Sequence, residues 1–352
     1  MTKIKQWQMT ELKKPLELKE SEINKIEPDD ALVKVAGCGV CHTDISFWDV
    51  GVPTKHQMPL TLGHEIAGEV IDGPNHLIGK KVVIPAVLPC GACELCENGY
   101  GNICQNQKMP GNDFHGGFAS HIVVPHKYLC IVPEKALDKY PLEHLAVIAD
   151  AVTTPYQALK KSELKAGDFC ICIGAGGVGI YGALLAKIMG AKVLSLDIDD
   201  NKLKIAEENG VDATLNIKDM DIKSIKNKVK EIAKELGVSR YMWKILEMSG
   251  TKPGQELGYA LLTHASTLSI VGFTLEKSEI RLSNLMAFDS KVIGTWGCKP
   301  ELYDEVMELI AEGKLNITPF VDTFPMSQIN EVLNNTLDHK YLKRSVLIPD
   351  FD

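Results

Sequence analysis

The pattern of hydrophobic and polar positions changes near residue 150. Up to that point the chain carries short alternating or apolar runs, broken by Gly, Pro and Asn, such as ALVKVAGCGV, EIAGEVI, KKVVIPAV and ASHIVVP. Short runs bounded by turn-forming residues are typical of β-strands. Residues 1–152 are therefore predicted to form a compact β-rich domain.

From about residue 154, apolar runs alternate with amphipathic runs. The stretch DFCICIGAGGVGIYGALLAKIMGAKVLSLDIDD predicts a strand, a glycine-rich turn, a helix and a second strand. Further helices are predicted in NKLKIAEENG, DIKSIKNKVKEIAKELG and GQELGYALLTH, and further strands in VDATLNI, YMWKILEMSG and STLSIVGF. Strands that alternate with helices form a parallel sheet covered on both faces. We therefore expect a doubly wound α/β domain over residues 153–294.

The last segment, residues 295–352, is predicted to contain two helices and one strand. The helices lie in ELYDEVMELIAEGKL and SQINEVLNNTLDHKY, and the strand lies in RSVLIP. At 352 residues the chain is too long for one simple core, which independently favours two domains.

Composition and charge narrow the possible functions. The chain is 45% hydrophobic and 24% charged, with a formal net charge of −8, which argues against a nucleic-acid-binding surface. The first residues are charged and lack the apolar core of a secretory signal, and no run approaches the roughly 20 apolar residues of a membrane span. Both features favour a cytoplasmic protein, in which thiols stay reduced.

The sequence GAGGVG at 174–179 is a G-x-G-x-x-G motif that follows a predicted strand and opens a predicted helix. In this context Gly174 permits a tight turn, Gly176 allows a pyrophosphate to approach the backbone, and Gly179 allows the helix to pack closely on the strand. Asp197 ends the next predicted strand, where a carboxylate accepts hydrogen bonds from the adenosine ribose and repels a 2′-phosphate. This favours NAD over NADP; the alternative is a glycine-rich turn without a nucleotide.

Four of the ten cysteines lie within the sixteen residues PCGACELCENGYGNIC. Cys90, Cys93, Cys96 and Cys104 have the spacing C-x2-C-x2-C-x7-C, and four thiolates in one short loop form a closed, structural zinc site. Disulfides or free thiols are the alternatives, and the expected reducing compartment disfavours disulfides.

A catalytic zinc site needs three protein ligands and one open position. Cys41 in GVCHTD, His64 in LGHEIAG and Asp150 in IADAVTTPY are candidates. Each also has an ordinary interpretation, because buried cysteines fill cores, a core histidine can be fully hydrogen-bonded, and an aspartate can cap the helix that begins near TTPYQAL. Spacing alone does not bring the three residues together.

Over nearly its whole length the chain resembles the zinc-dependent medium-chain alcohol dehydrogenases. The shared motifs, in order, are GCGVCHTD, LGHEIAGEV, the four-cysteine loop, GGFASH, GAGGVG and KRSVLIP. The resemblance implies a GroES-like catalytic domain, with a Rossmann domain inserted before the final segment. It also implies a small-molecule alcohol as substrate, NAD and two zinc ions as cofactors, and a homodimer or homotetramer.

The resemblance assigns roles to residues near the catalytic zinc. It identifies Cys41, His64 and Asp150 as ligands, although the third ligand varies in the family among Cys, Glu and Asp. Glu65 corresponds to a carboxylate behind the metal that can approach it. Asp44 corresponds to an acid that orients the histidine, and Thr43 to the hydroxyl that accepts the alcohol proton.

The resemblance also assigns cofactor contacts. Lys202 is placed near the adenosine ribose, Thr154 against the nicotinamide and Arg344 at the pyrophosphate. The complete cofactor set that it implies is Gly174, Gly176, Gly177, Val178, Gly179, Asp197, Lys202, Thr154, Val271 and Arg344. Many members carry a histidine at the outer end of the proton relay where this chain has Ser46, so the proton leaves through Ser46, another residue or water.

Two stretches, QNQKMPGNDFHGGFASHIVVP and VIADAVTTPYQA, are similar to the 6-hydroxycyclohex-1-ene-1-carbonyl-CoA dehydrogenases of anaerobic aromatic degradation. This narrower resemblance implies oxidation of a ring alcohol on a CoA thioester. Four lysines could contact CoA phosphates, namely Lys55, Lys108, Lys127 and Lys299. Each also has the ordinary interpretation of a solvated surface lysine, and none is assigned to CoA. The alternatives are a polyol or simple secondary-alcohol dehydrogenase of the same family, or a non-catalytic NAD-binding zinc protein.

Overall fold

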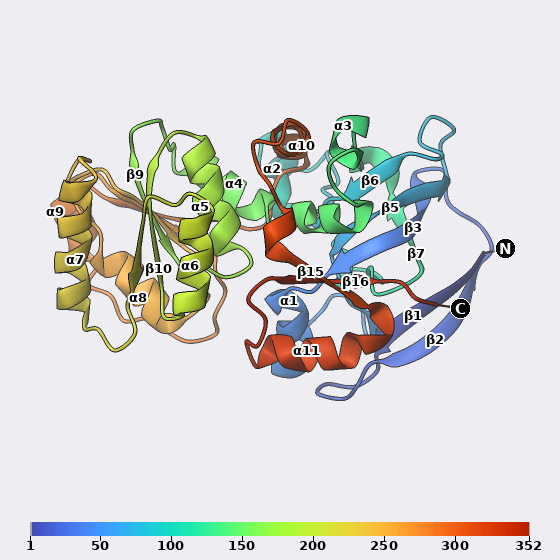
Figure 1. The fold of residues 1–352 in the computed structure, drawn as a ribbon. Helices are drawn as coiled ribbons and strands as arrows, with labels where there is room; N and C mark the ends of the chain where they lie inside the picture. Colours follow the sequence, from blue (N-terminus) through green and yellow to red (C-terminus); the bar gives the residue numbers. More distant parts are fainter. Residues whose placement is uncertain (1, 352) are drawn as a thin grey trace. The chain divides into compact units, whose positions relative to one another are not determined.

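A computed structural model describes residues 2–351, which divide into two compact units. Unit 1 comprises the residues up to Thr153 together with those from Gly297 onward, and unit 2 comprises Thr154–Trp296. The C-terminal segment therefore belongs to the same unit as the N-terminal part of the chain. In Figure 1 the N-terminal part runs from blue to green and the C-terminal segment is red. No helix within residues 2–351 is long and apolar enough to cross a bilayer.

Unit 2 is built on a six-stranded sheet in which every neighbouring pair is parallel. The order β11-β10-β9-β12-β13-β14 reverses direction between β9 and β12, so the connections cover both faces of the sheet. The expected α/β fold class with a Rossmann sheet is confirmed. The strands are β9 (Phe169–Ile173), β10 (Lys192–Asp197), β11 (Ala213–Asn216), β12 (Lys244–Glu247), β13 (Thr267–Ile270) and β14 (Lys291–Gly294).

The helices of unit 2 follow the amphipathic runs of the sequence. Three of them begin at a side-chain cap, since Asp199, Asp221 and Thr251 each accept a backbone N–H of the first turn. The helices are α4 (Thr153–Lys161), α5 (Gly179–Ile188), α6 (Asp200–Glu208), α7 (Ile222–Glu235), α8 (Lys252–Ala260) and α9 (Ser283–Phe288). All five residues of β9 are buried, so Cys170 and Cys172 serve as small core side chains.

Unit 1 contains two sheets that share one hydrophobic core. The larger sheet follows the order β15-β16-β3-β5-β6-β8 with β7 also paired to β3, and the smaller has the order β2-β1-β4. The strands are β1 (Thr2–Met9), β2 (Glu17–Ile23), β3 (Asp30–Gly39), β4 (Leu60–Thr61), β5 (Glu65–Asp72), β6 (Lys81–Ile84), β7 (His121–Pro125), β8 (Cys130–Ile131), β15 (Val321–Pro325) and β16 (Arg344–Ile348). The helices are α1 (His42–Ile45), α2 (Glu94–Glu97), α3 (Glu134–Leu137), α10 (Tyr303–Ala311) and α11 (Ile329–Leu337).

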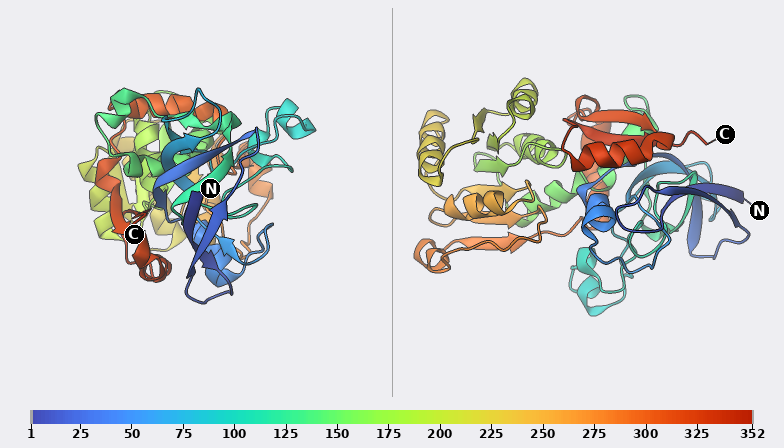
Figure 2. Two further views of the ribbon diagram at one scale, coloured as in Figure 1. Left: turned by 90° about the vertical axis from the view of Figure 1, so that its right-hand side faces the viewer. Right: turned by 90° about the horizontal axis from the view of Figure 1, so that it is seen from below.

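The C-terminal strands complete the larger sheet. β16 pairs antiparallel with the end of β3, with Val346 opposite Gly39, and β15 pairs parallel with β16. Figure 2 shows these red strands against the blue N-terminal strands of the same unit. Because Gly39 is also opposite Glu65, the first residues of β5 and β16 lie on either side of the end of β3. This arrangement places Arg344 close to Glu65.

Candidate active site and zinc centres

The first group of metal-binding side chains gathers at strand ends and loops of unit 1. Cys41 is the N-cap residue of α1, His64 precedes β5, and Glu65 begins β5. Asp150 follows the 3-10 helix Leu142–Ala149. The ligand atoms of these four residues all lie within 4.8 Å of one another. The structure therefore unites the three predicted ligands, and Glu65 lies with them.

The spacing of these atoms fits a tetrahedral zinc ion. Asp150 Oδ2 lies 3.7 Å from Cys41 Sγ and 3.7 Å from His64 Nε2. With zinc–ligand bonds of about 2.0–2.3 Å, the ligands of a tetrahedral site are separated by about 3.3–3.8 Å. α4 begins three residues after Asp150, at Thr153. The position and spacing of Asp150 therefore suit a zinc ligand.

Asp44 positions the residues of the catalytic zinc site through hydrogen bonds. Its buried carboxylate accepts the Cys41 N–H at 2.9 Å and the Gly63 N–H at 3.0 Å, and its Oδ1 lies 3.4 Å from His64 Nδ1. A histidine whose Nδ1 faces a carboxylate presents Nε2 to a metal. Burial lowers the pKa of His64, but the charge of Asp44 and hydrogen bonds to Asp150 and Asp44 outweigh burial and leave the pKa raised. The electrostatic potential at the site is thus negative and attracts a cation.

Glu65 is held by an arginine from the other end of the chain. Arg344 Nε donates to Glu65 Oε2 at 2.9 Å, and Nη2 donates to Oε1, so both carboxylate oxygens are engaged. Both side chains are buried, with exposed fractions of 6% for Arg344 and 0% for Glu65. Sequence reasoning assigned Arg344 to the pyrophosphate and missed this pair, whose members are 279 residues apart. The pyrophosphate contact stays a prediction.

Two hydroxyl groups lie near the ligands. Thr43 Oγ1 is 3.6 Å from Cys41 Sγ, and its side chain is partly exposed, as a group that meets substrate must be. Ser46 Oγ donates to the His42 carbonyl at 2.9 Å. This local hydrogen bond gives the Ser46 hydroxyl a structural role within the chain.

The second metal-binding group is the four-cysteine loop, which contains α2 and the 3-10 turn Gly101–Ile103. The Sγ atoms lie 3.5 Å apart for Cys93–Cys96 and Cys90–Cys104, 3.6 Å for Cys93–Cys104 and 4.0 Å for Cys90–Cys96. A disulfide needs about 2.05 Å, whereas a tetrahedral zinc with Zn–S bonds of about 2.3 Å separates sulfurs by about 3.8 Å. Hydrogen bonds from the Ala92 backbone and from Cys104 lower the pKa of Cys90 to about 6. The loop is a structural zinc site, and disulfide pairing is excluded.

The glycine-rich motif forms the turn between β9 and α5 in unit 2. Gly174 has a φ of 92°, a backbone conformation that residues with a side chain rarely adopt. A Cβ added at Gly179 would overlap the Gly174 carbonyl. Within residues 2–351, no atom lies within 4 Å of a Cβ added at Gly176, so the space above that backbone is open. The three glycines thus have the surroundings that the fingerprint requires.

Asp197 is fixed beside this turn at the end of β10. Its Oδ2 accepts the Ala175 N–H at 2.6 Å, and its Oδ1 accepts the N–H groups of Ile198 at 2.8 Å and Asp199 at 3.0 Å. The turn and Asp197 both lie at the carboxyl ends of parallel strands, where α/β sheets bind ligands. Two further predicted cofactor residues, Gly177 and Val178, lie in the turn before α5, with Val178 at its N-cap. The others in unit 2 are Thr154 and Lys202, in α4 and α6, and Val271, next to the end of β13.

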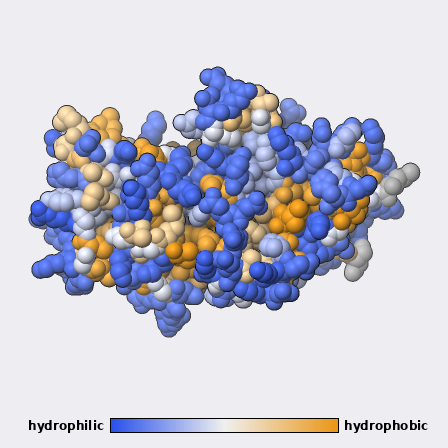
Figure 3. All heavy atoms as spheres, turned by 90° about the horizontal axis from the view of Figure 1, so that it is seen from above, coloured by the Kyte–Doolittle hydropathy of each residue, from blue (hydrophilic) through white to orange (hydrophobic). Residues whose placement is uncertain are grey.

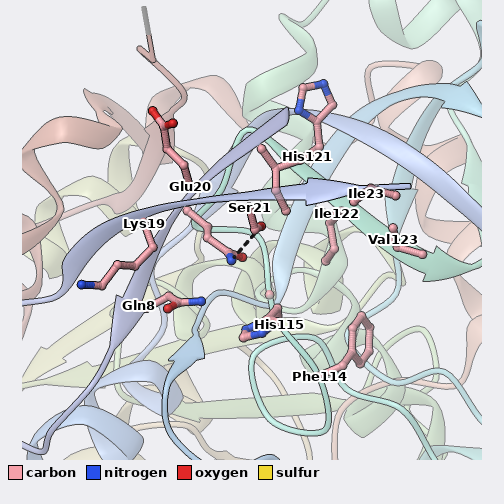
Figure 4. Close-up of a pocket in the computed structure, with 13 residues that line it drawn as sticks. Gln8, Lys19, Glu20, Ser21, Ile23, Phe114, His115, His121, Ile122 and Val123 are labelled. Atoms are coloured by element: carbon pink, nitrogen blue, oxygen red, sulfur yellow. Dashed lines mark hydrogen bonds between the residues drawn. The ribbon is translucent and has the colours of Figure 1, made fainter. Parts of the chain in front are cut away.

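A separate cavity of about 630 Å³ lies in unit 1, between the β1–β2 hairpin and the segment that leads into β7 (Figure 4). Gln6 Nε2 donates to Ser21 Oγ at 3.3 Å, and His115 Nδ1 accepts the Thr61 N–H at 3.2 Å. Burial lowers the pKa of both His115 and His121. None of the lining residues belongs to either metal-binding group.

Comparison with known proteins agrees with this geometry. Residues 27–134 match the alcohol dehydrogenase GroES-like domain, and residues 177–312 match the zinc-binding dehydrogenase family. An alcohol dehydrogenase of Geobacillus stearothermophilus is 32% identical over 345 residues, which cover 96% of this chain and 97% of the relative. The chain belongs to the zinc-containing medium-chain alcohol dehydrogenases.

Solved structures extend the comparison. The alcohol dehydrogenase of the hyperthermophilic archaeon Aeropyrum pernix has a TM-score of 0.85 and 27% identity, covering 98% of this chain and 100% of that one. Acetophenone reductase of Geotrichum candidum, in complex with NAD, has a TM-score of 0.84 and 25% identity, covering 98% and 97%. The protein is therefore a zinc-dependent alcohol dehydrogenase with a catalytic and a structural zinc site.

Proposed function

We propose that this dehydrogenase oxidises a secondary alcohol with NAD as the hydride acceptor. The observation that carries the proposal is the grouping of Cys41 Sγ, His64 Nε2 and Asp150 Oδ2. Asp150 Oδ2 lies 3.7 Å from each of the other two atoms, and all three lie within 4.8 Å of one another, which fits a zinc ion with three protein ligands. Arg344 engages both oxygens of Glu65 and so favours a fourth position that is left to the alcohol.

The side chains of unit 1 divide the chemistry between them. When bound, zinc supplies a Lewis acid that lowers the pKa of the alcohol. The Cys41 thiolate and the Asp150 carboxylate balance the charge of the ion, and Asp44 holds the His64 ring in the orientation that it needs. The Thr43 hydroxyl, beside Cys41, accepts the alcohol proton.

The cofactor preference rests on Asp197. A carboxylate fixed by three backbone N–H groups at the edge of the glycine-rich turn accepts ribose hydroxyls and repels a 2′-phosphate. We assign the remaining contacts to the glycine-rich loop with Gly177 and Val178, and to Thr154, Lys202, Val271 and Arg344.

For the substrate we propose the ring alcohol of 6-hydroxycyclohex-1-ene-1-carbonyl-CoA, which would be oxidised to the 6-oxo compound in benzoyl-CoA degradation. The support is the likeness of residues 105–125 and 147–158 to such dehydrogenases. The first stretch contains His115 and His121 of the unit 1 cavity, and the second contains Asp150. Of the lysines considered for CoA, Lys55 is already paired with Asp113 at 3.0 Å.

The test is NADH formation with the CoA thioester, the free acid, cyclohexanol and sorbitol. We expect strong activity on the thioester alone. Activity on cyclohexanol or sorbitol with none on the thioester would refute the CoA substrate and favour the polyol or simple-alcohol alternative. No activity on any of them, with zinc and NAD bound, would favour a non-catalytic NAD-binding protein.

We also propose that the protein forms a homo-oligomer. Several large apolar side chains near β14, the outermost strand of the unit 2 sheet, are exposed, and contiguous apolar patches mark interaction surfaces. Figure 3 shows hydrophobic side chains gathered at several places on one face of the molecule. The exposed side chains are Phe273, Leu275, Leu282, Met286 and Val292. Light scattering that gives the mass of a single chain would contradict this assembly.

A further inference from the structure

We propose that Tyr303 is a positioning residue for Asp150 and thereby sets the zinc affinity of the catalytic site. The proposal rests on the ligand role given to Asp150 above. Tyr303 begins α10, in the segment that returns to unit 1, and only 1% of its surface is exposed. A buried hydroxyl requires hydrogen-bond partners, and those that it has lie next to a zinc ligand.

The Tyr303 hydroxyl uses both its donor and its acceptor capacity. It donates to the carbonyl of Ala149 and accepts the N–H of Ala86 at 3.3 Å. The Ala86 N–H also lies 3.4 Å from the Ala149 carbonyl oxygen, so the tyrosine hydroxyl strengthens a weak backbone contact at the same carbonyl. The Ala149 carbonyl belongs to the peptide group that joins Ala149 to Asp150. Because a peptide group is planar, fixing its oxygen also fixes the backbone from which the Asp150 side chain starts.

Asp150 stands at a point where regular structure does not define the backbone. It follows the 3-10 helix with φ −144° and ψ −57°, and α4 begins only at Thr153. A metal ligand must be held within roughly 0.5 Å of its productive position. At this point of the chain, contacts from outside the segment must therefore supply part of that precision.

A second hydroxyl holds the preceding carbonyl. Thr153 Oγ1 donates to the Ile148 carbonyl at 2.9 Å, so the carbonyls of Ile148 and Ala149 are both fixed by side chains. Thr153 belongs to the same stretch of chain, whereas Tyr303 is 154 residues away. Tyr303 therefore ties the position of Asp150 to α10, which packs against α3 and the 3-10 helix (Figure 1).

The chain offers a matched control in Tyr140. Its hydroxyl is also buried and donates to a backbone carbonyl, that of Leu315, at 3.2 Å. This bond likewise connects the middle of the chain with the C-terminal segment, but neither Tyr140 nor Leu315 adjoins a metal-binding residue. Tyr140→Phe and Tyr303→Phe thus remove the same chemical group from two similar environments.

The experiment measures the dissociation constant of the catalytic zinc by chelator competition in wild type, Tyr303→Phe and Tyr140→Phe. Loss of a group that orients a metal ligand weakens binding about 10- to 100-fold, and we expect this loss in Tyr303→Phe only. The zinc of the four-cysteine loop is an internal reference that should not change. An equal loss in both variants, or no loss in Tyr303→Phe, would overturn the proposal. If Tyr303→Phe fails to fold, Thr153→Val removes the neighbouring side-chain bond, to the Ile148 carbonyl. Weaker zinc binding in that variant would support positioning of Asp150 through these carbonyls, and unchanged zinc binding would overturn it.

A double-mutant cycle separates this proposal from the ligand assignment. In an Asp150→Asn background, Tyr303→Phe should no longer change zinc affinity, because the group that it positions has lost its charge. If Asp150→Asn weakens zinc and Tyr303→Phe still adds its full loss, Tyr303 does not act through Asp150. If Asp150→Asn leaves zinc affinity unchanged, the ligand role itself fails, and the positioning role fails with it.

Discussion

The buried pair Glu65–Arg344 provides a sharp test of how unit 1 is held together. Its members begin β5 and β16, on either side of the end of β3, and two hydrogen bonds join them. We predict that Arg344→Met destabilises unit 1 strongly. Methionine keeps much of the apolar bulk but leaves the Glu65 carboxylate buried without its partner.

The magnitude follows from burial. Glu65 is 0% exposed and Arg344 is 6% exposed, so solvent screens the pair very little. Removing one member of a buried ion pair typically costs about 3–5 kcal/mol, because the remaining charge is desolvated and uncompensated. Replacing both members by neutral residues costs much less. Arg344→Met combined with Glu65→Gln should therefore recover most of the loss.

The assay is hydrogen exchange followed by mass spectrometry, which reads the opening free energy of each strand. Peptides covering β5 and β16 should exchange roughly 10²- to 10⁴-fold faster in Arg344→Met than in wild type. Peptides covering β9 and β12 of unit 2 are the internal control and should be unchanged. A loss below about 1 kcal/mol, or a double variant as unstable as the single one, would refute the reasoning.

Three further predictions concern the other sites. Cys96→Ser should lose the structural zinc and lower the melting temperature together, and an unchanged melting curve would contradict the structural role. Asp197→Asn should raise kcat/KM with NADP relative to NAD by about tenfold or more, since the repelling charge is removed; an unchanged ratio would show that Asp197 does not select the cofactor. Burial raises the pKa of Glu247 in unit 2, so the stability that its protonated form contributes is present below the ordinary glutamate pKa and lost as pH rises through the folded value. Glu247→Gln should therefore gain stability relative to wild type as pH rises above the ordinary glutamate pKa in thermal unfolding, and a constant difference would disprove this.

The parts of the molecule that sequence reasoning predicted well are local. The strand β9, the glycine-rich turn and α5 are adjacent in the chain. Their hydrophobic pattern and the glycine motif therefore lie in one short stretch and predict the same strand–turn–helix unit. The four-cysteine loop is similarly contained in sixteen residues, so its spacing alone indicates zinc. The short elements α9 and β14 escaped prediction because their side chains are largely exposed and carry little hydrophobic pattern.

The contacts that shape the catalytic site are not local, and no hydrophobic periodicity or sequence motif predicts them. Arg344 meets Glu65 across 279 residues, and Tyr303 meets Ala149 across 154. Both arise because the C-terminal segment returns to unit 1 after the whole of unit 2. The union of Cys41 with Asp150 likewise depends on how the strands pair, and only resemblance to a family could suggest it in advance.

The central claim is that Cys41 and its neighbours hold a catalytic zinc distinct from that of the four-cysteine loop. The most direct measurement is zinc content per chain, together with NAD-dependent alcohol oxidation, in wild type and Cys41→Ser. We predict two zinc ions per chain in wild type, corresponding to the two metal-binding groups, and one in Cys41→Ser. The variant should lose alcohol oxidation but keep the melting curve of the wild-type protein, because the structural zinc is retained. Two zinc ions or wild-type turnover in Cys41→Ser would contradict the claim.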